Sequence, residues 1–289
     1  MKNLKLISYA KINLALLIKN KRSDGYHEIE SVMQTISLHD TIKLKKNKDI
    51  ICKTNVKNIP TDEKNFAVKA AKIFFKHTKI DGGVKIKIKK NIPTEGGLGG
   101  GSSNAAFVLL GLNRLYKTKL EKNTLLKLSE KIGADVPFFI CGGTAYINGI
   151  GEKIENINSI ENFYIVLIKP NFGIKTKDAY IKYDEFYNKN KKSEKSSIEN
   201  LILSINGEKK IEEISKFFFN DFEKILNFEI IKEIKNKIKN LNALSCNITG
   251  SGSCLFATFK KIKYAKKAMK FLKKEKIKTF LCYPIKKYF

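Results

Sequence analysis

The sequence predicts an α+β protein built from two domains, and three patterns support that prediction. The first part of the chain alternates apolar and polar residues, which is typical of half-buried strands. A glycine-rich segment at residues 96–101 separates an alternating stretch from a strongly apolar one, as in a strand, a loop and a buried helix. Later in the chain, the expected order of strand, helices, hairpin, helix and strand is the plan of a ferredoxin-like domain. We therefore expect an N-terminal domain of residues 1–155 and a C-terminal α+β domain of residues 156–289.

The N-terminal domain is expected to begin with short strands and turns. Asp24 and Gly25 form an Asp-Gly pair, which is the strongest local signal of a hairpin turn. A later helical pattern places Phe66, Ala70, Ile73 and Phe74 on one side. The expected segments are strands at residues 4–8, 12–18, 36–44 and 50–54 and a helix at residues 66–75.

A second group of elements surrounds the glycine-rich segment. Residues 84–89 alternate strictly between apolar side chains and lysines, which predicts a strand with one solvated lysine face. The residues after Ser103 are apolar around much of a helix circumference, so this helix should be buried. Thr118 and Glu121 have capping-box spacing and predict the start of another helix, at residues 118–132.

The C-terminal domain is expected to begin with a continuous apolar strand at residues 163–168. Residues 188–197 are highly charged and predict a flexible linker. The other expected segments are helices within residues 174–187 and 198–239, strands at 246–249 and 254–259, a helix at 264–274 and a last strand at 280–285.

The formal net charge of +28 would ordinarily indicate a nucleic-acid partner or an anionic membrane surface. Of the 56 basic residues only Arg22 and Arg114 are arginines, whereas phosphate and base recognition commonly uses the bidentate arginine side chain. We interpret the lysine excess as a drift in coding bias and expect no nucleic-acid partner.

Several function classes are excluded by what the pattern lacks. The longest apolar stretches are far shorter than the ~20 residues of a membrane span, and no signal-peptide pattern precedes them, so a cytoplasmic protein without a membrane partner is expected. The five cysteines are scattered without Cys-x-x-Cys pairs or histidine partners at ligand spacing. We expect reduced, mostly buried thiols and no metal-binding cluster.

The glycine-rich segment is the most informative part of the sequence. Five of the six residues from Gly96 to Gly101 are glycines, so successive backbone N–H groups can converge on an anion. The following helix would add its free N-terminal donors, and Ser102 and Ser103 would add hydroxyls. The segment is neither a Walker A loop nor the dinucleotide fingerprint. It predicts a phosphate-binding loop, the alternative being a flexible surface loop.

This segment resembles the ATP-binding motif of the superfamily of galactokinase, homoserine kinase, mevalonate kinase and phosphomevalonate kinase. The resemblance implies a two-domain small-molecule kinase fold whose N-terminal domain is like a ribosomal-protein domain, with ATP and Mg²⁺ as cofactors. Glu95 departs from the small residue usual there, and we expect its carboxylate to point outward or to help hold magnesium. The residues that the resemblance assigns to the nucleotide are Pro93, Thr94, Glu95, Gly96, Gly97, Leu98, Gly99, Gly100, Gly101, Ser102 and Ser103.

Residues 10–14 and 133–139 resemble the diphosphocytidyl-methylerythritol kinase branch of this superfamily. The resemblance implies that Lys11 and Asp135 flank the substrate hydroxyl as catalytic residues. A carboxylate that takes the proton and an ammonium that stabilises the oxyanion would each lower the barrier. Lys11 could instead be one more solvated lysine, and Asp135 could cap the helix that begins near Pro137.

Residues 24–27 are similar to the substrate motif of the same branch. The resemblance implies that Tyr26 stacks on cytosine, that His27 hydrogen-bonds the base, and that Tyr180 is the second aromatic of a clamp. Thr249 begins a glycine-rich turn similar to the third superfamily motif, which either orients the substrate diphosphate or is a tight hairpin turn. The remaining predicted substrate contacts are Asn13 and Thr176.

The function that follows from this resemblance is ATP-dependent phosphorylation of the 2-hydroxyl of 4-diphosphocytidyl-2-C-methyl-D-erythritol in the non-mevalonate isoprenoid pathway. The substrate would be a small molecule that carries a cytidine diphosphate group, and the protein would be a monomer or a weak homodimer. The alternatives are another kinase of the superfamily, such as homoserine kinase, and a basic RNA-binding protein.

Overall fold

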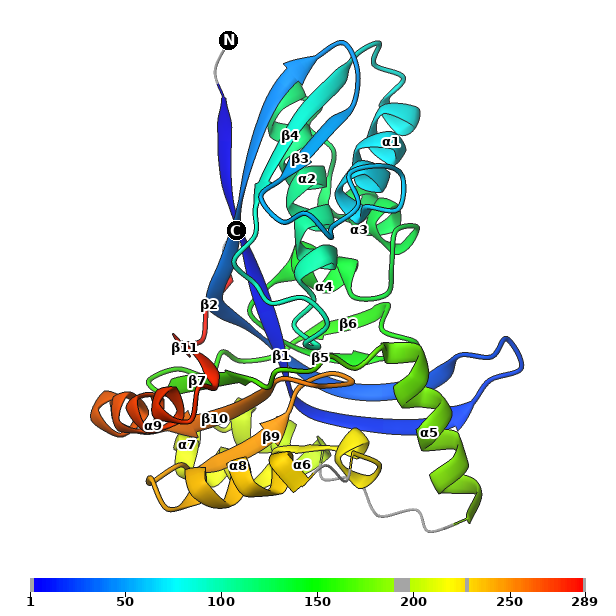
Figure 1. Ribbon diagram of the computed structural model, residues 1–289. Helices are drawn as coiled ribbons and strands as arrows, with labels where there is room; N and C mark the ends of the chain where they lie inside the picture. The colour runs from blue at the N-terminus through cyan, green and yellow to red at the C-terminus, as the bar shows by residue number, and fades with distance from the viewer. Residues whose placement is uncertain (1–2, 190–197, 227–228, 288–289) are drawn as a thin grey trace.

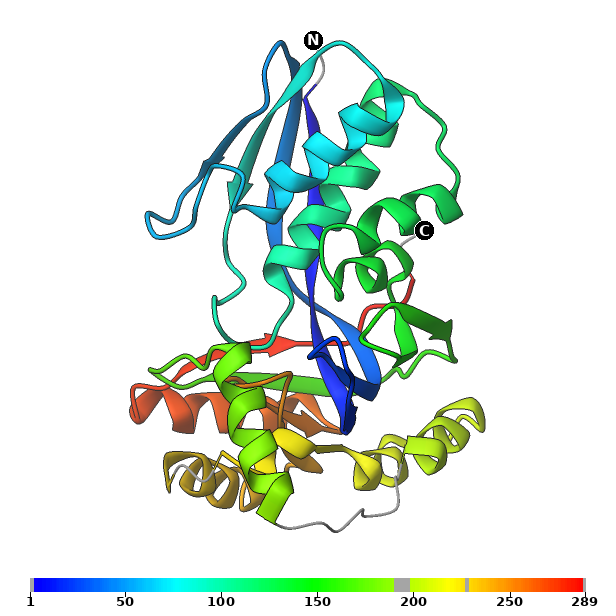
Figure 2. The ribbon, with the colours of Figure 1, turned by 90° about the vertical axis from the view of Figure 1, so that its right-hand side faces the viewer.

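The computed structural model describes residues 3–189, 198–226 and 229–287. Within these ranges the chain forms two sheets with helices packed against them, so the predicted α+β class is confirmed (Figures 1 and 2). The larger sheet contains β1 (Leu4–Lys21), β2 (His27–Asn47), β3 (Ile51–Thr54), β4 (Gly83–Lys89), β5 (Thr144–Asn148), β6 (Lys153–Asn156) and β8 (Phe219–Asn220). Its neighbouring helices are α1 (Phe66–Thr78), α2 (Gly100–Tyr116), α3 (Lys122–Glu130) and α4 (Val136–Cys141).

The smaller sheet belongs to the C-terminal part of the chain. Its strands are β7 (Tyr164–Lys169), β9 (Ser245–Ile248), β10 (Leu255–Phe259) and β11 (Lys278–Cys282). The α-helices of this part are α5 (Thr176–Lys189), α6 (Ile198–Asn206), α7 (Ile211–Ile214), α8 (Glu229–Lys239) and α9 (Ile262–Lys274), and two 3₁₀ turns are η1 (Ser215–Phe217) and η2 (Asp221–Lys224). None of the helices in the described ranges is both long enough and apolar enough to span a membrane.

The strands β1 and β2 form one long antiparallel hairpin that runs through the molecule (Figure 1). The expectation of short strands is wrong here, because β1 continues for 18 residues and its pairing with β2 absorbs three register irregularities. Residues 10–16 of β1 are all buried, since packed layers cover both faces of this segment. The predicted turn at Asp24 and Gly25 joins the two strands, with Gly25 at φ 85°.

The predicted helix at residues 66–75 is present as α1, whereas the predicted helix start at Thr118 is wrong. Phe66 begins α1 but leaves 36% of its surface exposed, because the buried side of α1 is formed by residues such as Ala67 and Phe74. Thr118 does not cap a helix, since its hydroxyl donates to Asn113 Oδ1 at 2.7 Å. The helix α3 therefore begins later than expected, after Glu121.

The smaller sheet has the strand order β11-β7-β10-β9 with antiparallel neighbours, which is the ferredoxin-like arrangement expected from the sequence. Residues 165–168 of β7 are all apolar, and they are buried on both faces of the strand. Ile165 and Leu167 pack toward the larger sheet, and Val166 and Ile168 pack in the core with α8 and α9. This two-sided burial explains the continuous apolar run in the sequence.

The two sheets share one core. Ala10 and Ile12 of β1 belong to the same apolar cluster as Phe163 and Phe256. In addition, β8 pairs in parallel with β1, whereas the sequence predicts only helices over residues 198–239. The boundary between residues 155 and 156 stays a prediction, and residues 190–197 of the expected linker lie outside the described residues.

Candidate active site

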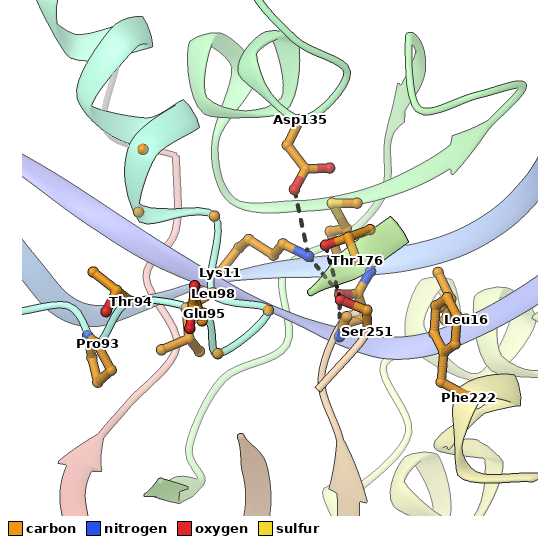
Figure 3. Close-up of a pocket in the computed structure, with 18 of the residues that line it drawn as sticks. Lys11, Leu16, Pro93, Thr94, Glu95, Leu98, Asp135, Thr176, Phe222 and Ser251 are labelled. Carbon is orange, nitrogen blue, oxygen red and sulfur yellow. Dashed lines mark hydrogen bonds and ion pairs between the residues drawn. The ribbon is translucent and has the colours of Figure 1, made fainter. Parts of the chain in front are cut away.

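A pocket of about 360 Å³ lies where β1, the segment of residues 93–101, α4, α5 and the turn after β9 meet (Figure 3). We call residues 93–101 the glycine loop. The predicted site residues that line this pocket are Lys11, Asn13, Asp135, Thr176, Tyr180 and all nine residues of the glycine loop. The predicted residues outside its lining are Tyr26, His27, Ser102, Ser103 and Thr249. Segments far apart in sequence therefore converge on one cavity.

The glycine loop needs glycine at two positions for geometric reasons. Gly97 has φ 70°, and a Cβ atom placed there would lie 2.1 Å from the carbonyl oxygen of Thr249. Gly99 has φ 66°, and its Cβ would lie 2.7 Å from the ring of Phe139. Both backbone conformations are in the left-handed region that favours glycine. The loop is therefore pressed between the turn after β9 and α4, which excludes the alternative of a flexible surface loop.

The N-terminus of α2 opens at the glycine loop. Its N-cap residue is Gly99, and no side chain caps it in the described part of the chain. The first N–H groups of a helix lack partners within the helix, and the positive end of the helix dipole lies beside them, so this end suits an anion such as a phosphate. The expectation that the Ser103 hydroxyl contacts a phosphate is wrong, because Ser103 is fully buried and its Oγ bonds to Ser8 Oγ at 2.7 Å.

Glu95 lines the pocket at the side of the glycine loop that meets the segment between β7 and α5. Its side chain is exposed, and a Cβ atom on Gly173 would lie only 2.6 Å from Glu95 Oε2. The carboxylate therefore lies against the backbone of the segment between β7 and α5.

The side chains of Lys11 and Asp135 point toward each other in the pocket (Figure 3). Lys11 Nζ lies 3.7 Å from Asp135 Oδ2, and Lys11 is only 3% exposed, so it is not a solvated lysine. Asp135 precedes α4 at the cap position but makes no side-chain capping hydrogen bond. Its carboxylate is 33% exposed and is directed toward the pocket. The pair thus places an ammonium and an accessible carboxylate next to each other in the pocket.

Asn13 connects Lys11 to the turn after β9. Its Oδ1 accepts hydrogen bonds from Lys11 Nζ at 2.6 Å and from the backbone N–H of Gly250 at 3.0 Å. Its backbone N–H donates to Thr249 Oγ1 at 3.0 Å. Thr249 is fully buried, so its hydroxyl holds this junction together and does not line the pocket. Beside this junction, the hydroxyls of Thr176 and Ser251 lie 3.0 Å apart (Figure 3).

The predicted base-binding residues are only partly brought together. Tyr180 stacks on His27 with ring centroids 4.8 Å apart, and His27 Nε2 lies 2.6 Å from Asp184 Oδ1. Tyr26 is 62% exposed, and within the described residues no ring contact joins it to Tyr180. Burial, together with the negative charge of Asp135, raises the pKa of Tyr180 to about 12, so its hydroxyl stays protonated near neutral pH.

Two parts of the site were not found from the sequence. An apolar pocket of about 250 Å³ lies beside the glycine loop and shares Lys90, Thr94 and Gly101 with the first pocket. Phe66 lines it, which explains why this phenylalanine is not in the core. The second part is Asp184, whose pKa is lowered by hydrogen bonds from Lys21 and His27 that outweigh the opposing effect of burial. In the sequence, the only signal for this pocket was an aromatic residue, Phe66, at the start of a helical pattern.

No cluster of three or more His, Cys, Asp or Glu residues that could hold a metal occurs in the described ranges. The residues near the glycine loop that could approach a cation are Glu95 and Asp135. Mg²⁺ in phosphate-transfer sites is commonly held by one or two carboxylates together with substrate phosphates. The donor set fits a metal that arrives with a nucleotide better than a metal held by the protein alone.

The fold and the site together define a small-molecule kinase of the GHMP class, which is named after galactokinase, homoserine kinase, mevalonate kinase and phosphomevalonate kinase. The family described as GHMP kinases N terminal domain matches residues 65–143, and GHMP kinases C terminal matches residues 209–278. A solved structure of 4-(cytidine 5'-diphospho)-2C-methyl-D-erythritol kinase superposes with a TM-score of 0.81 at 26% identity, covering 97% of this chain and 99% of that one. A homoserine kinase from Cytophaga hutchinsonii has a TM-score of 0.78 at 19% identity, covering 99% and 96%, and shows the shared fold.

Closer relatives identify the branch. A 4-diphosphocytidyl-2-C-methyl-D-erythritol kinase from Clostridium tetani is 44% identical over 259 residues, which are 89% of this chain and 91% of the relative. The protein of the same name from Caldicellulosiruptor bescii is 41% identical over 286 residues, or 96% and 98% of the two chains. The chain belongs to the 4-diphosphocytidyl-2-C-methyl-D-erythritol kinase family.

Proposed function

We propose that this protein transfers the γ-phosphoryl group of ATP to the 2-hydroxyl of 4-diphosphocytidyl-2-C-methyl-D-erythritol, in the non-mevalonate isoprenoid pathway. The observation that carries the proposal is the Lys11–Asp135 pair, which lies in one pocket with the uncapped N-terminus of α2. Phosphoryl transfer depends mainly on positioning and on charge stabilisation, and this pocket supplies both.

The nucleotide is expected to bind across the glycine loop. Its phosphates would meet the N–H groups at the start of α2, and its adenine would enter the apolar pocket lined by Phe66 and Ile88. The two pockets share residues, so one extended ligand can occupy both. Mg²⁺ would bind with the phosphates and neutralise part of their charge. Glu95 and Asp135 are the carboxylates of this pocket that would approach the metal ion.

Asp135 is proposed as the general base. Its accessible carboxylate would accept the proton of the substrate hydroxyl while the hydroxyl oxygen attacks the γ-phosphorus and the bond to ADP breaks. Lys11 would stabilise the negative charge that develops on the attacking oxygen. Asn13 holds Lys11 Nζ at 2.6 Å, so the ammonium is positioned before the substrate arrives.

The cytosine ring is proposed to bind between Tyr26 and Tyr180, with His27 at its polar edge. Tyr180 covers His27 in this structure, so Tyr180 must leave His27 when the base binds. Asp184 holds His27 by Nε2, which leaves Nδ1 for the base. A neutral imidazole with its proton on Nε2 could then accept a hydrogen bond from the exocyclic amine of cytosine.

The remaining proposals follow from the sequence and the family. We infer a cytoplasmic enzyme, a monomer or weak homodimer, with a kinase domain at residues 1–155 and a C-terminal domain at residues 156–289 that completes the substrate site. The substrate is a small molecule, and no nucleic-acid partner is proposed.

The test is an assay of the purified protein for ATP-dependent phosphorylation of the diphosphocytidyl alcohol, with homoserine as the alternative acceptor. Lys11→Met and Asp135→Asn should each lower kcat by roughly two orders of magnitude or more. Lys5→Met is the matched control, because Lys5 lies on the same strand and is exposed. Phosphorylation of homoserine in place of the cytidine substrate would refute the assignment. Near-normal turnover by either variant would remove that residue from the mechanism.

A further inference from the structure

A buried carboxylate lies beneath the glycine loop. Asp40, on β2, is fully buried, and its Oδ1 accepts hydrogen bonds from the backbone N–H groups of Asn91 at 2.7 Å and Ile92 at 2.9 Å. Its Oδ2 accepts from Asn104 Nδ2 at 3.0 Å and from Lys90 Nζ. The carboxylate therefore connects β2 to the segment between β4 and the glycine loop and to the first turns of α2.

A buried ion pair commonly contributes little net free energy to the stability of a fold. The desolvation cost of two charges often equals or exceeds their attraction, and apolar residues of similar volume commonly serve as well. The Asp40–Lys90 pair is almost completely removed from solvent, with side chains 0% and 8% exposed. Lys90 lies three residues before Pro93, where the glycine loop begins, and it lines the pocket, which indicates a role in the site that the loop forms.

Lys90 has one hydrogen-bond donor to spare. A lysine ammonium has three N–H donors. Lys90 Nζ uses two of them, one on Asp40 Oδ2 and one on Asn104 Oδ1 at 3.2 Å. The described residues provide no acceptor for the third. Lys90 lines the pocket, and its Nζ lies 3.2 Å from the position of a Cβ atom on Gly100, the first residue of α2. The spare donor thus lies at the helix end that suits a phosphate.

We propose that Lys90 binds the phosphates of the nucleotide and that Asp40 is the positioning residue that holds its ammonium beside the N-terminus of α2. The proposal rests on the use of ATP by this pocket. Asn104 completes the arrangement, since it contacts both Asp40 and Lys90 and donates to Ser8 Oγ at 2.9 Å. The neighbouring Lys89 projects from β4 to solvent, so the two adjacent lysines have opposite roles.

The test compares ligands that differ only in their phosphates. Binding of ADP and of adenosine to the full chain is measured by calorimetry for the wild type, Lys90→Met and the control Lys89→Met. Lys90→Met should weaken ADP on the order of tenfold or more, the loss of one hydrogen bond to a charged group, and should leave adenosine within about twofold. Lys89→Met should change neither. Equal weakening of both ligands by Lys90→Met would reduce Lys90 to a structural role and overturn the proposal.

The double variant Asp40→Asn/Lys90→Met separates folding from binding. Each single variant leaves one buried charge without its partner, so each should lower Tm, whereas the double variant removes both charges and should recover part of that loss. The affinity for ADP should not recover with Tm. Recovery of both together would refute the phosphate contact. Failure of the wild type to bind either ligand would instead refute the use of ATP itself.

Discussion

Gly97→Ala is the most direct test of how the glycine loop is built. The φ of 70° at Gly97 costs an alanine roughly 1–2 kcal/mol. The new Cβ would lie 2.1 Å from Thr249 O and 2.9 Å from Thr249 C, which are backbone atoms that cannot rotate away. Overpacking of this kind costs roughly 1–3 kcal/mol, so the free energy of unfolding should fall by roughly 2–5 kcal/mol in total. That is a large part of the ~5–15 kcal/mol that stabilises a typical domain.

The assay for Gly97→Ala is urea unfolding, with Gly101→Ala as the matched control. Gly101 lies in the first turn of α2, and a Cβ atom there would meet nothing within 4 Å. Its replacement should leave stability unchanged or raise it by roughly 0.4–1 kcal/mol. Turnover of Gly97→Ala should also fall, because displacement of Thr249 moves Gly250, which holds Asn13. If the two variants unfold at the same urea concentration, the loop is not pressed against this turn.

Three further predictions concern thiols, acid stability and base recognition. Burial raises the pKa values of Cys254 and Cys282 to about 12, so native protein at pH 8 should react slowly with iodoacetamide, and mass spectrometry should find both thiols labelled only after unfolding. The pKa of Asp184 is lowered in the folded state, so its contribution to stability is present above its ordinary value of about 3.9 and is lost as the pH falls through the folded value. The Tm values of wild type and Asp184→Asn should therefore differ at pH 7, and their difference should begin to shrink as the pH falls below about 4. His27→Ala should narrow the ratio of kcat/KM for the cytidine substrate over a uridine analogue, whereas Tyr26→Ala should weaken both equally by ~1–3 kcal/mol.

Each of these three predictions can be contradicted by its own measurement. Rapid labelling of the native thiols would contradict the burial of Cys254 and Cys282. A Tm difference for Asp184→Asn that persists unchanged at pH 3 would show that its charge does not stabilise the fold. An unaltered cytidine-to-uridine ratio in His27→Ala would remove His27 from base reading.

The sequence predicted those parts of the site that form local patterns. The glycine loop, Lys11 and Asp135 each lie in a short contiguous motif, and the structure places them around one pocket. The same local signals failed for Ser103, because its position in a motif does not reveal which face of α2 it occupies. That face is fixed by packing against Ser8, on a strand far away in sequence.

The features that escaped prediction depend on contacts between distant segments. Asp40 looks like an ordinary polar residue of a strand, and only the segment just before the glycine loop, with the N–H groups of Asn91 and Ile92, gives it two donors. The two residues of β8 are too few to show an alternating pattern, and only β1 gives them a partner. The position of Phe66 in a pocket also escaped prediction, because a helical pattern does not distinguish a core-facing side from one that lines a ligand pocket.

The hydrogen bonds of Asn13 also determine when the enzyme can become active during its synthesis. Asn13 contacts Thr249 and Gly250, which follow it by 236 and 237 residues. A ribosome completes the N-terminal part first, at ~5–20 residues per second. The lysine, the aspartate and the glycine loop therefore emerge well before the turn that fixes Lys11 through Asn13. A nascent chain that stops short of this turn has every residue proposed for catalysis and still lacks the completed geometry.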